Sequence, residues 1–306
     1  MFNLLYLAKP RFGGWVTFTA HLALKQNWKL FRITKSDEKK TRPFGYGINY
    51  KNIRIESLPP NLLITAIDKN FYKYLDEIPD QSHIVIHDPT ELKKELIPHL
   101  SRFNIITIRK TVQDLLMDKY NLDSTFLPHP FFEYEKSNKI KYGVCSISRI
   151  DYDKHTDILI KANDILETPI DIYGAKNDLY IYRKLGDSLL PYYKGGFKKD
   201  FIELDKILSG YKFMIDMSAI KGDGAGSQYT FLEAIHQGNI LILSKSWTNG
   251  LDSEFKHGVN CLIVENPDDI KMVIEDSDLD IISILNNADK LLLKHTQINW
   301  DLNNID

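Results

Sequence analysis

The chain has 306 residues, of which 43% are hydrophobic, and a formal net charge of −2, which is typical of a soluble globular protein long enough for two domains. No run approaches the roughly 18 to 20 apolar residues that a membrane-spanning helix needs, and the opening MFNLLYLAKPRF lacks the basic start and cleavage site of a signal peptide. The two cysteines, Cys145 and Cys261, indicate neither a disulfide framework nor a metal site, so we expect a cytoplasmic protein.

The charge is unevenly distributed along the chain. Residues 1–132 carry 19 Lys and Arg against 13 Asp and Glu, whereas residues 133–306 carry 20 against 28. A basic half is compatible with an anionic partner such as nucleic acid, an acidic glycan or a lipid surface. It is equally compatible with surface charges that happen to segregate.

Apolar, β-rich runs alternate with segments of helical spacing through both halves of the chain. The first half contains FNLLYLA, a helix from Trp15 to Lys25, and then WKLFRIT, HIVIHD, FNIITIRK and TFLPHP. After about residue 140 the pattern restarts with YGVCSIS, PIDIYGA, KFMIDMS, NILILSK and CLIVEN. This alternation predicts two parallel α/β sheets, with HPFFEYEKSNKIK as the linker. Ligands of such sheets bind at the carboxyl ends of the strands.

Two loops of the first half carry candidate residues. Gly13 and Gly14 open the first helix, where a residue without a Cβ lets the backbone approach a ligand, although a tight turn explains them equally well. His87 and Asp88 end a predicted strand and are candidates for the lining of a cleft. Their structural alternatives are a hydrogen-bonded strand-end histidine and a helix cap.

The first strand of the second half ends near Ser148 and is followed by two cations. Arg149 and Lys154 stand five residues apart, before a helix that starts at about Thr156. A guanidinium and an ammonium beside the carboxyl end of a strand can neutralise a diphosphate. As isolated residues they are equally explained as surface charges.

A glycine-rich turn lies in AIKGDGAGSQYTFLEAIHQGNILIL, after a later strand of the same predicted sheet. Unpaired N–H groups at the start of the following helix, which we expect near Ser227, form a site for a phosphate. Glu233, about two turns into that helix, is placed to accept hydrogen bonds from a ribose diol, or else it is a glutamate on the helix surface. The spacing matches neither the Rossmann nor the P-loop fingerprint, so a flexible connection remains the alternative.

Taken in order, these segments resemble the GT-B retaining glycosyltransferases that use nucleotide-diphosphate sugars, the group that contains glycogen and sucrose synthase-like enzymes. RFGGWVTFTAHLAL is similar to the glycine loop of that family, FLPHPF to IPNPV, and SISRIDYDKHTDILIKA to GRLxxxKGxxxLLxA. GAGSQYTFLEAIHQG is similar to EGFGLxxLEAMAxG, and HTQINWDLNN to the segment that crosses back to the first domain.

The resemblance implies two Rossmann-like domains facing a cleft. It implies an acceptor-side domain over residues 1–134, a donor domain over residues 135–290 and a returning segment over residues 291–306. Arg149 and Lys154 fall on the catalytic cations of the family, and Glu233 on its ribose-binding glutamate. The full set of donor-binding residues implied is Gly13, Gly14, Arg149, Lys154, Gly174, Asp223, Gly226, Ser227, Gln228, Tyr229, Thr230 and Glu233.

The chain departs from the family pattern at two positions. The first glutamate of the E-x7-E pair falls on Ala225, and Asp223 is the nearest carboxylate that could substitute for it. The acceptor-side histidine of the family falls on Arg109 of ITIRKTV, and we count Arg109, His87 and Asp88 as catalytic candidates together with the two cations.

The resemblance implies transfer of a sugar, expected to be glucose-like, from a nucleotide diphosphate to an acceptor hydroxyl with retention of configuration. A UDP-sugar is the expected co-substrate, with no further cofactor and no metal. A non-catalytic nucleotide-sugar-binding protein, or an epimerase or phosphorylase of the same architecture, remains an alternative.

The missing first glutamate and the run YTFLEAIHQG also resemble the T-even phage DNA α-glucosyltransferases, whose corresponding run is YTHLELGACG. This likeness implies hydroxymethylated DNA as one acceptor. The basic first half, including KSDEKKTRPFGYG, fits a phosphate backbone. It fits a glycolipid or a surface polysaccharide equally well.

Overall fold

The computed structural model describes residues 1–9, 13–34, 41–219, 228–248 and 254–302. The predicted site residues Asp223, Gly226 and Ser227 lie outside the described residues. The chain divides into two compact units, which are described separately below. Unit 1 comprises Met1–Glu133 with Lys294–Asp306, and unit 2 comprises Tyr134–Leu293.

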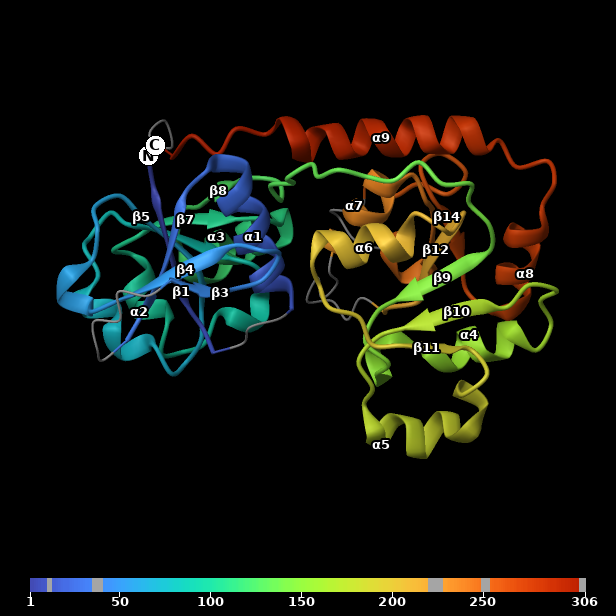
Figure 1. The fold of residues 1–306 in the computed structure, drawn as a ribbon. Helices are drawn as coiled ribbons and strands as arrows, with labels where there is room; N and C mark the ends of the chain where they lie inside the picture. Colours follow the sequence, from blue (N-terminus) through green and yellow to red (C-terminus); the bar gives the residue numbers. More distant parts are fainter. Residues whose placement is uncertain (10–12, 35–40, 220–227, 249–253, 303–306) are drawn as a thin grey trace. The chain divides into compact units, whose positions relative to one another are not determined.

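Unit 1 is built on an eight-stranded sheet with the order β3-β4-β2-β1-β5-β6-β7-β8 (Figure 1). All neighbouring strands are parallel except β3 and β4. The strands are β1 (Asn3–Leu7), β2 (Lys29–Ile33), β3 (Thr41–Pro43), β4 (Asn49–Ile53), β5 (Leu62–Ile67), β6 (His83–Ile86), β7 (Asn104–Thr107) and β8 (Thr125–Phe126).

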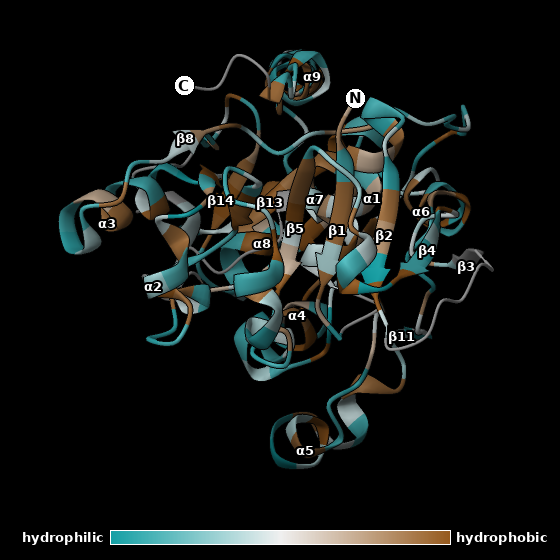
Figure 2. Ribbon diagram, turned by 90° about the vertical axis from the view of Figure 1, so that its left-hand side faces the viewer, coloured by the Kyte–Doolittle hydropathy of each residue, from teal (hydrophilic) through white to brown (hydrophobic). Residues whose placement is uncertain are grey.

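The central strands of unit 1 are buried on both faces, as a parallel sheet covered by helices requires. β1, β5 and β6 consist almost entirely of buried residues, and Figure 2 shows β1 and β5 mainly in the hydrophobic colour. The longest helix of this unit, α1, buries Val16 through Ala23 in a row. The helices are α1 (Gly14–Gln26), α2 (Ile97–Leu100) and α3 (Lys110–Tyr120), with 3-10 turns η1 (Ile55–Ser57), η2 (Tyr72–Glu77) and η3 (Pro89–Glu91).

Unit 2 is built on a six-stranded, all-parallel sheet with the order β11-β10-β9-β12-β13-β14. Counted along this unit, the order is 3-2-1-4-5-6, which is the doubly wound order of the Rossmann fold. The order therefore reverses between β9 and β12. The strands are β9 (Val144–Ile147), β10 (Ile170–Tyr173), β11 (Tyr193–Gly195), β12 (Phe213–Asp216), β13 (Ile240–Ser244) and β14 (Leu262–Val264).

Helices of unit 2 cover this sheet (Figure 1). One core joins alternate residues of β10 and β12 to α4, α8 and the start of α9. α7 is buried from Tyr229 to Gln237, which is the pattern of a helix enclosed on all sides. The helices are α4 (Thr156–Asn163), α5 (Asp178–Tyr180), α6 (Phe201–Leu208), α7 (Gln228–Gln237), α8 (Pro267–Glu275) and α9 (Ile281–Gln297), with short helical turns η4 (Tyr152–Lys154), η5 (Ile181–Leu185), η6 (Gly186–Leu189) and η7 (Lys245–Thr248).

The predicted strands are confirmed, as are the three predicted helices, which correspond to α1, α4 and α7, but the sequence pattern missed four strands. β5 lies next to β1 at the centre of its sheet, although its continuous apolar run LLITAI carries no period by which a strand differs from a buried helix. β3 and β11 are short edge strands, and β4, of mixed polarity, lies next to the edge between β3 and β2. Strands of this kind depend on pairing with a neighbour, which local sequence does not encode.

Candidate active site

The first candidate site lies in unit 2, where the strand order reverses. Lys154 belongs to the connection that follows β9, and Ser218 follows β12, the neighbouring strand. Lys154 Nζ donates a hydrogen bond to Ser218 Oγ at 2.7 Å. Since ligands of doubly wound sheets bind at this reversal, the contact places a lysine ammonium at the expected edge.

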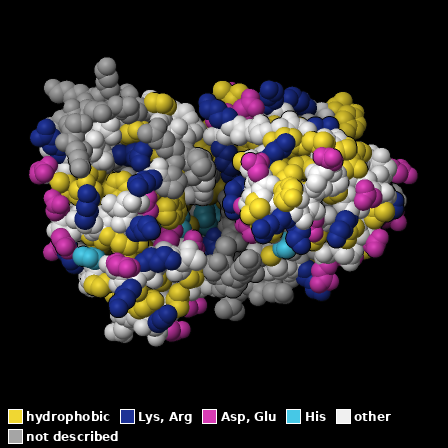
Figure 3. Space-filling view, turned by 90° about the horizontal axis from the view of Figure 1, so that it is seen from below, with side chains coloured by type: hydrophobic (Ala, Val, Ile, Leu, Met, Phe, Trp, Pro, Cys, Tyr) yellow, Lys and Arg dark blue, Asp and Glu magenta, His cyan; other side chains and the backbone are white. Residues whose placement is uncertain are grey.

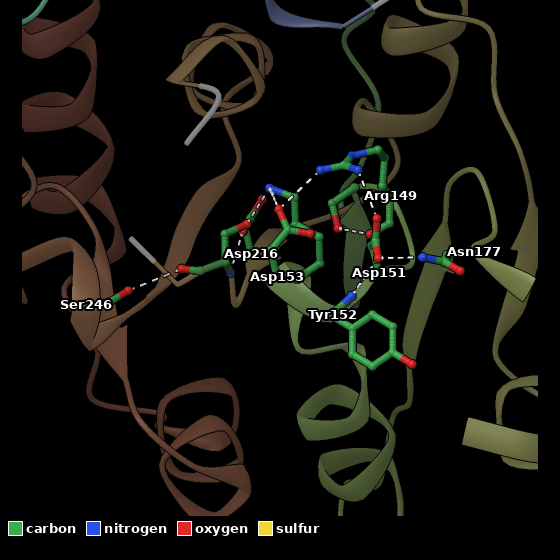
Figure 4. Close-up of polar contacts among 10 residues, drawn as sticks. Arg149, Asp151, Tyr152, Asp153, Asn177, Asp216 and Ser246 are labelled. Atoms are coloured by element: carbon green, nitrogen blue, oxygen red, sulfur yellow. Dashed lines mark hydrogen bonds and ion pairs between the residues drawn. The ribbon is translucent and has the colours of Figure 1, made fainter. Parts of the chain in front are cut away.

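The two predicted cations, Arg149 and Lys154, meet at the carboxylate of Asp153. Figure 4 shows Arg149 beside Asp151 and Asp153. Arg149 Nη2 donates to Asp153 Oδ2 at 3.1 Å, and Lys154 Nζ lies 4.0 Å from the same oxygen. Arg149 Nη1 also donates to Asp151 Oδ2 at 2.9 Å. The Arg149 side chain is 60% exposed and that of Lys154 is 13% exposed. Because exposed ion pairs contribute only about 0–1 kcal/mol, a diphosphate can displace the aspartates from Arg149.

Asp151 and Asn177 join the loop after β9 to the loop after β10. Asp151 Oδ1 accepts hydrogen bonds from the Tyr152 N–H at 2.8 Å and from Asn177 Nδ2 at 2.7 Å. Asn177 Oδ1 in turn caps α5, because it accepts from the backbone N–H groups of Leu179 and Tyr180. Asp151, which accepts a hydrogen bond from Arg149, is therefore itself fixed by Asn177 of the loop that follows β10.

Gly174, which the sequence assigned to donor binding, has a steric role in this junction. A Cβ at Gly174 would lie 1.8 Å from the carbonyl oxygen of Ser148, and the φ angle of the residue is +147°. Only glycine fits such an approach between the ends of β10 and β9. Gly174 N–H donates to the Gly195 carbonyl, so the same residue also joins β11.

A buried aspartate orients the serine that Lys154 contacts. The backbone N–H of Ser218 donates to Asp216 Oδ1 at 2.7 Å, and its hydroxyl donates to the same oxygen. The hydroxyl proton of Ser218 is thus directed at Asp216, which leaves its oxygen to accept from Lys154. Ser246 Oγ donates to the Ser218 carbonyl at 3.2 Å, which adds the connection after β13.

Glu233 lies in the interior of unit 2. The residue is completely buried in α7. Burial is the main cause that raises the pKa of the Tyr134 and Tyr229 hydroxyls, and the negative charge of Glu233 raises both further. The carboxylate therefore lies near these two rings. Of the neighbouring predictions, Tyr229 and Thr230 are buried in the same helix, and Gln228 is its first residue.

A second group of predicted residues lies at the carboxyl edge of the sheet in unit 1. His87 follows β6 and is buried, and its Nε2 donates to the Thr65 carbonyl at 2.7 Å. Burial lowers the pKa of His87 to about 4. The imidazole is therefore neutral at pH 7 with its proton on Nε2, so Nδ1 carries a lone pair that can accept a hydrogen bond.

The buried Glu91, which sequence reasoning did not select, connects His87 to the first glycine turn. Its Oε1 accepts from Trp15 Nε1 at 2.5 Å, and its Oε2 accepts from the His87 backbone N–H at 2.9 Å. Burial raises the pKa of Glu91 to about 8. Trp15 directly follows Gly13 and Gly14, both of which are exposed. The carboxyl group of Glu91 therefore binds both Trp15, which follows the glycine turn, and the backbone of His87.

Asp88 and Arg109 have different positions in this group. Asp88 Oδ1 accepts from the Thr90 N–H at 2.8 Å and caps the turn Pro89–Glu91, which is the structural alternative that its sequence position suggested. Arg109 is half-buried at the start of α3, and its positive charge contributes to the lowered pKa of His87 and of His129. Arg109 therefore lies close to His87.

Besides Glu91, the residues that sequence reasoning missed are Asp216, Ser218, Asp151, Asp153 and Asn177. Asp216 and Ser218 end the apolar run KFMIDMS, so a search for polar residues at strand ends would have found them. Asp151, Asp153 and Asn177 carry no such signal, because their role depends on how the loops after β9 and β10 fold. Among the described residues, no group of three His, Cys, Asp or Glu side chains could hold a metal ion. No helix in the described part of the chain is long and apolar enough to cross a membrane.

Comparison with known proteins gives structural neighbours only. The chain matches no protein-family model and no curated protein sequence. It is similar to the structure of Anabaena Alr3699/HepE in complex with UDP and glucose, with a TM-score of 0.66, 14% sequence identity and coverage of 96% of this chain and 95% of that chain.

Two further neighbours differ in how much of their length this chain spans. The apo form of the lipopolysaccharide outer core galactosyltransferase WaaB gives a TM-score of 0.58 at 14% identity, with coverage of 96% of this chain and 97% of that chain. The pneumococcal O-GlcNAc transferase GtfA, in complex with UDP and GlcNAc, gives a TM-score of 0.57 at 14% identity, with coverage of 77% of this chain and 53% of that chain. The chain thus spans about half of GtfA. These likenesses confirm the predicted fold class: the chain has the GT-B fold, with two parallel-sheet α/β domains.

Proposed function

We propose that the protein is a glycosyltransferase that moves a hexose from UDP-hexose to an acceptor hydroxyl. The observation that carries the proposal is the convergence of Arg149 and Lys154 on the loop edge where the sheet of unit 2 reverses. The similarity to structures that hold UDP supports the choice of nucleotide. In this proposal unit 2, with residues 135–290 as its core, holds the donor, and unit 1 contributes the acceptor side.

The chemistry that these residues can perform is stabilisation of a leaving group. As the bond between the anomeric carbon and the phosphate oxygen breaks, negative charge grows on the distal phosphate of UDP. Lys154 is held by Ser218 before the reaction begins, and Arg149 can exchange Asp151 and Asp153 for phosphate oxygens. Groups already oriented toward a developing charge lower the barrier more than they stabilise the ground state. We propose that these two cations replace an obligatory metal ion.

In this proposal His87 of unit 1 accepts a hydrogen bond from the substrate hydroxyl that receives the sugar. Its Nε2–H is engaged by the Thr65 carbonyl, and its neutral Nδ1 is suited to accept from an alcohol. Retention of configuration, by attack on the face from which UDP departs, follows from the family resemblance. The predicted ribose contact of Glu233 and the substitution of Asp223 for the missing first glutamate belong to the same proposal.

For the acceptor we propose a hydroxyl of a glycolipid or polysaccharide rather than a hydroxymethylated DNA base. Arg32 lies over the rings of Tyr6 and Tyr50 and donates to the Ala8 carbonyl, and Arg102 pairs with Asp76 and Asp80. These two arginines of the basic half are therefore engaged within unit 1 rather than presented to a phosphate backbone.

The surface of unit 1 supports the same choice. On the face seen in Figure 3, the described Lys and Arg side chains of unit 1 alternate with acidic and hydrophobic ones and, among the described residues, form no continuous basic stripe. Residues 35–40 of the basic segment KSDEKKTRPFGYG lie outside the described residues. WaaB, of which this chain covers 97%, is a lipopolysaccharide outer core galactosyltransferase. The DNA acceptor inferred from YTFLEAIHQG is the alternative that the experiment below tests.

The test is a thermal-shift screen with UDP, GDP, ADP and their sugar conjugates. A ligand at a hundred times its Kd stabilises a protein by about 2.7 kcal/mol, which is a shift of several degrees. We expect UDP and a UDP-hexose to give the largest shift. The best donor is then incubated with lipopolysaccharide core, polysaccharide and hydroxymethylated DNA, and the anomeric configuration of the product is read by NMR. No stabilisation by any nucleotide would refute the proposal, and transfer to DNA alone would overturn the acceptor assignment.

A further inference from the structure

A second concave site lies in unit 2, on the face of the sheet beside α6. Its volume is about 720 Å³, which is within the range of small-ligand sites. It contains neither Arg149 nor Lys154 nor Ser218. The lining includes Tyr142, Asp171, Tyr173, Lys194, Phe197 and Tyr211.

The pocket extends from the amino ends of β9 and β10 to the carboxyl ends of β10 and β11, where Tyr173 and Phe197 lie. Tyr142 and Gly143 precede β9, and Thr168 and Pro169 precede β10, so these residues lie at the amino ends of the strands. Lys154 follows the opposite, carboxyl end of β9. Four residues of strand span roughly 13 Å. A nucleotide diphosphate held at the carboxyl edge therefore leaves the amino-end part of the pocket unfilled.

The sheet presents polar groups to this pocket because side chains alternate along β10. Ile170 and Ile172 point into the hydrophobic core, whereas Asp171 and Tyr173 line the pocket on the other face. α6 contributes Glu203, Lys206 and Ile207 to the same lining. Asp171 and Tyr173 thus line the hollow next to that helix.

A directed chain of hydrogen bonds fixes the polar groups. The Tyr211 hydroxyl donates to Asp171 Oδ2 at 2.6 Å, and Lys194 Nζ lies 3.1 Å from Asp171 Oδ1. Tyr173 Oη and Tyr211 Oη are 2.9 Å apart. Because Tyr211 gives its one proton to Asp171, Tyr173 is the donor in that pair. The oxygen of Tyr173 therefore presents its lone pairs to a ligand, while Lys194 presents further N–H groups.

The pocket combines this fixed polar chain with the aromatic side chains of Tyr142, Tyr173, Phe197 and Tyr211. Sugar rings have apolar C–H faces and hydroxyls that both donate and accept, so they match a site of aromatic faces with mixed acceptors and donors. We infer that this pocket is a second carbohydrate site, which binds a neutral oligosaccharide segment independently of the nucleotide-sugar site. The inference goes beyond the proposed function and does not depend on it.

The test uses maltohexaose, cellohexaose and chitohexaose as probes, with binding measured by isothermal titration calorimetry on the full chain. At least one of the three is expected to bind in the absence of nucleotide. Tyr142 is 69% exposed, so Tyr142→Ala removes an aromatic face without a core contact. Loss of such a face is expected to weaken binding about tenfold. Tyr182→Ala is the matched control, since Tyr182 is 85% exposed in the same unit and does not line the pocket.

A second variant probes the polar chain. Tyr173→Phe keeps the ring and removes the hydroxyl that presents lone pairs, so we expect about a tenfold loss of oligosaccharide affinity. The Kd for UDP should stay unchanged in both pocket variants. The inference is overturned if none of the hexasaccharides binds, if both pocket variants bind like Tyr182→Ala, or if the variants weaken UDP to the same extent. UDP binding without oligosaccharide binding refutes this site alone, and the reverse result refutes the donor site alone.

Discussion

Lys154 Nζ and Ser218 Oγ lie 2.7 Å apart although 64 residues separate them in the chain. The contact joins the loops after β9 and β12, the two strands between which the sheet of unit 2 reverses its order. Asp216 fixes the serine by accepting a hydrogen bond from its backbone N–H. A lysine fixed in this way loses little conformational freedom when it receives a phosphate, because its orientation is set before the ligand arrives.

We predict that Lys154→Met lowers the turnover of the preferred UDP-sugar by about a hundredfold or more, since the stabilising charge disappears from the transition state. Ser218→Ala should cost about tenfold, because Lys154 keeps its charge but loses the acceptor that orients it. Both effects are measured as initial rates of UDP release. Lys161→Met on the exposed side of α4 serves as the control and should stay within twofold of the wild type. Wild-type rates from Lys154→Met would contradict the assignment.

Gly174→Ala should destabilise unit 2 by about 3 kcal/mol or more, because the new methyl group would meet the Ser148 carbonyl at 1.8 Å in a conformation that favours glycine. Urea denaturation followed by circular dichroism measures the loss. Gly210→Ala is the control, since a Cβ there meets nothing closer than 3.7 Å. Equal stability of the two variants would contradict this prediction, since it would mean that the ends of β9 and β10 can move apart to admit the methyl group without loss of stability.

Glu91 should make the protein less stable as the pH rises from 6.5 to about 8. Its pKa is raised from the ordinary value of 4.5 to about 8 in the folded protein, so across this interval the folded chain retains a proton that the unfolded chain has released. The free energy of unfolding therefore falls with pH and levels off above 8. The lowered pKa of His87 acts in the opposite direction, but only between about pH 4 and its ordinary value of 6.5.

Urea titrations of the wild type and of Glu91→Gln at pH 6.5 and pH 8.5 test this contribution. The variant is expected to be less stable at both values, because its amide N–H₂ group faces a donor, either Trp15 Nε1 or the His87 N–H. Its difference between the two pH values should nevertheless be smaller than that of the wild type. An identical difference in both proteins would mean that Glu91 does not titrate in this range.

Glu233→Gln should raise the Kd for UDP about tenfold with a smaller effect on turnover, if the carboxylate accepts hydrogen bonds from the ribose. Calorimetry measures the Kd, and the thermal midpoint verifies that the fully buried site tolerates the amide. Glu275→Gln on α8, where the glutamate pairs with Lys271 on the surface, is the control. An unchanged Kd would assign Glu233 to the packing around Tyr134 and Tyr229 instead.

The sequence by itself determined the fold class and the location of the cations. Alternation of apolar runs and helical spacing is a local property, and it predicted two parallel sheets whose strands are confirmed at Asn3–Leu7, Val144–Ile147 and Phe213–Asp216. Because a loop that follows a parallel strand emerges at the carboxyl edge, Arg149 and Lys154 could be assigned to that edge without coordinates.

Only the tertiary structure decided which side chains hold these groups. Ser218 reaches Lys154, Asn177 reaches Asp151, and Trp15 reaches Glu91 across 64, 26 and 76 residues of chain. Such contacts depend on which strands pair and in what register, and no local pattern encodes either. The same is true of the pocket beside α6, where Tyr211, in the segment after α6, meets the Asp171 side chain of β10 on one face of the sheet.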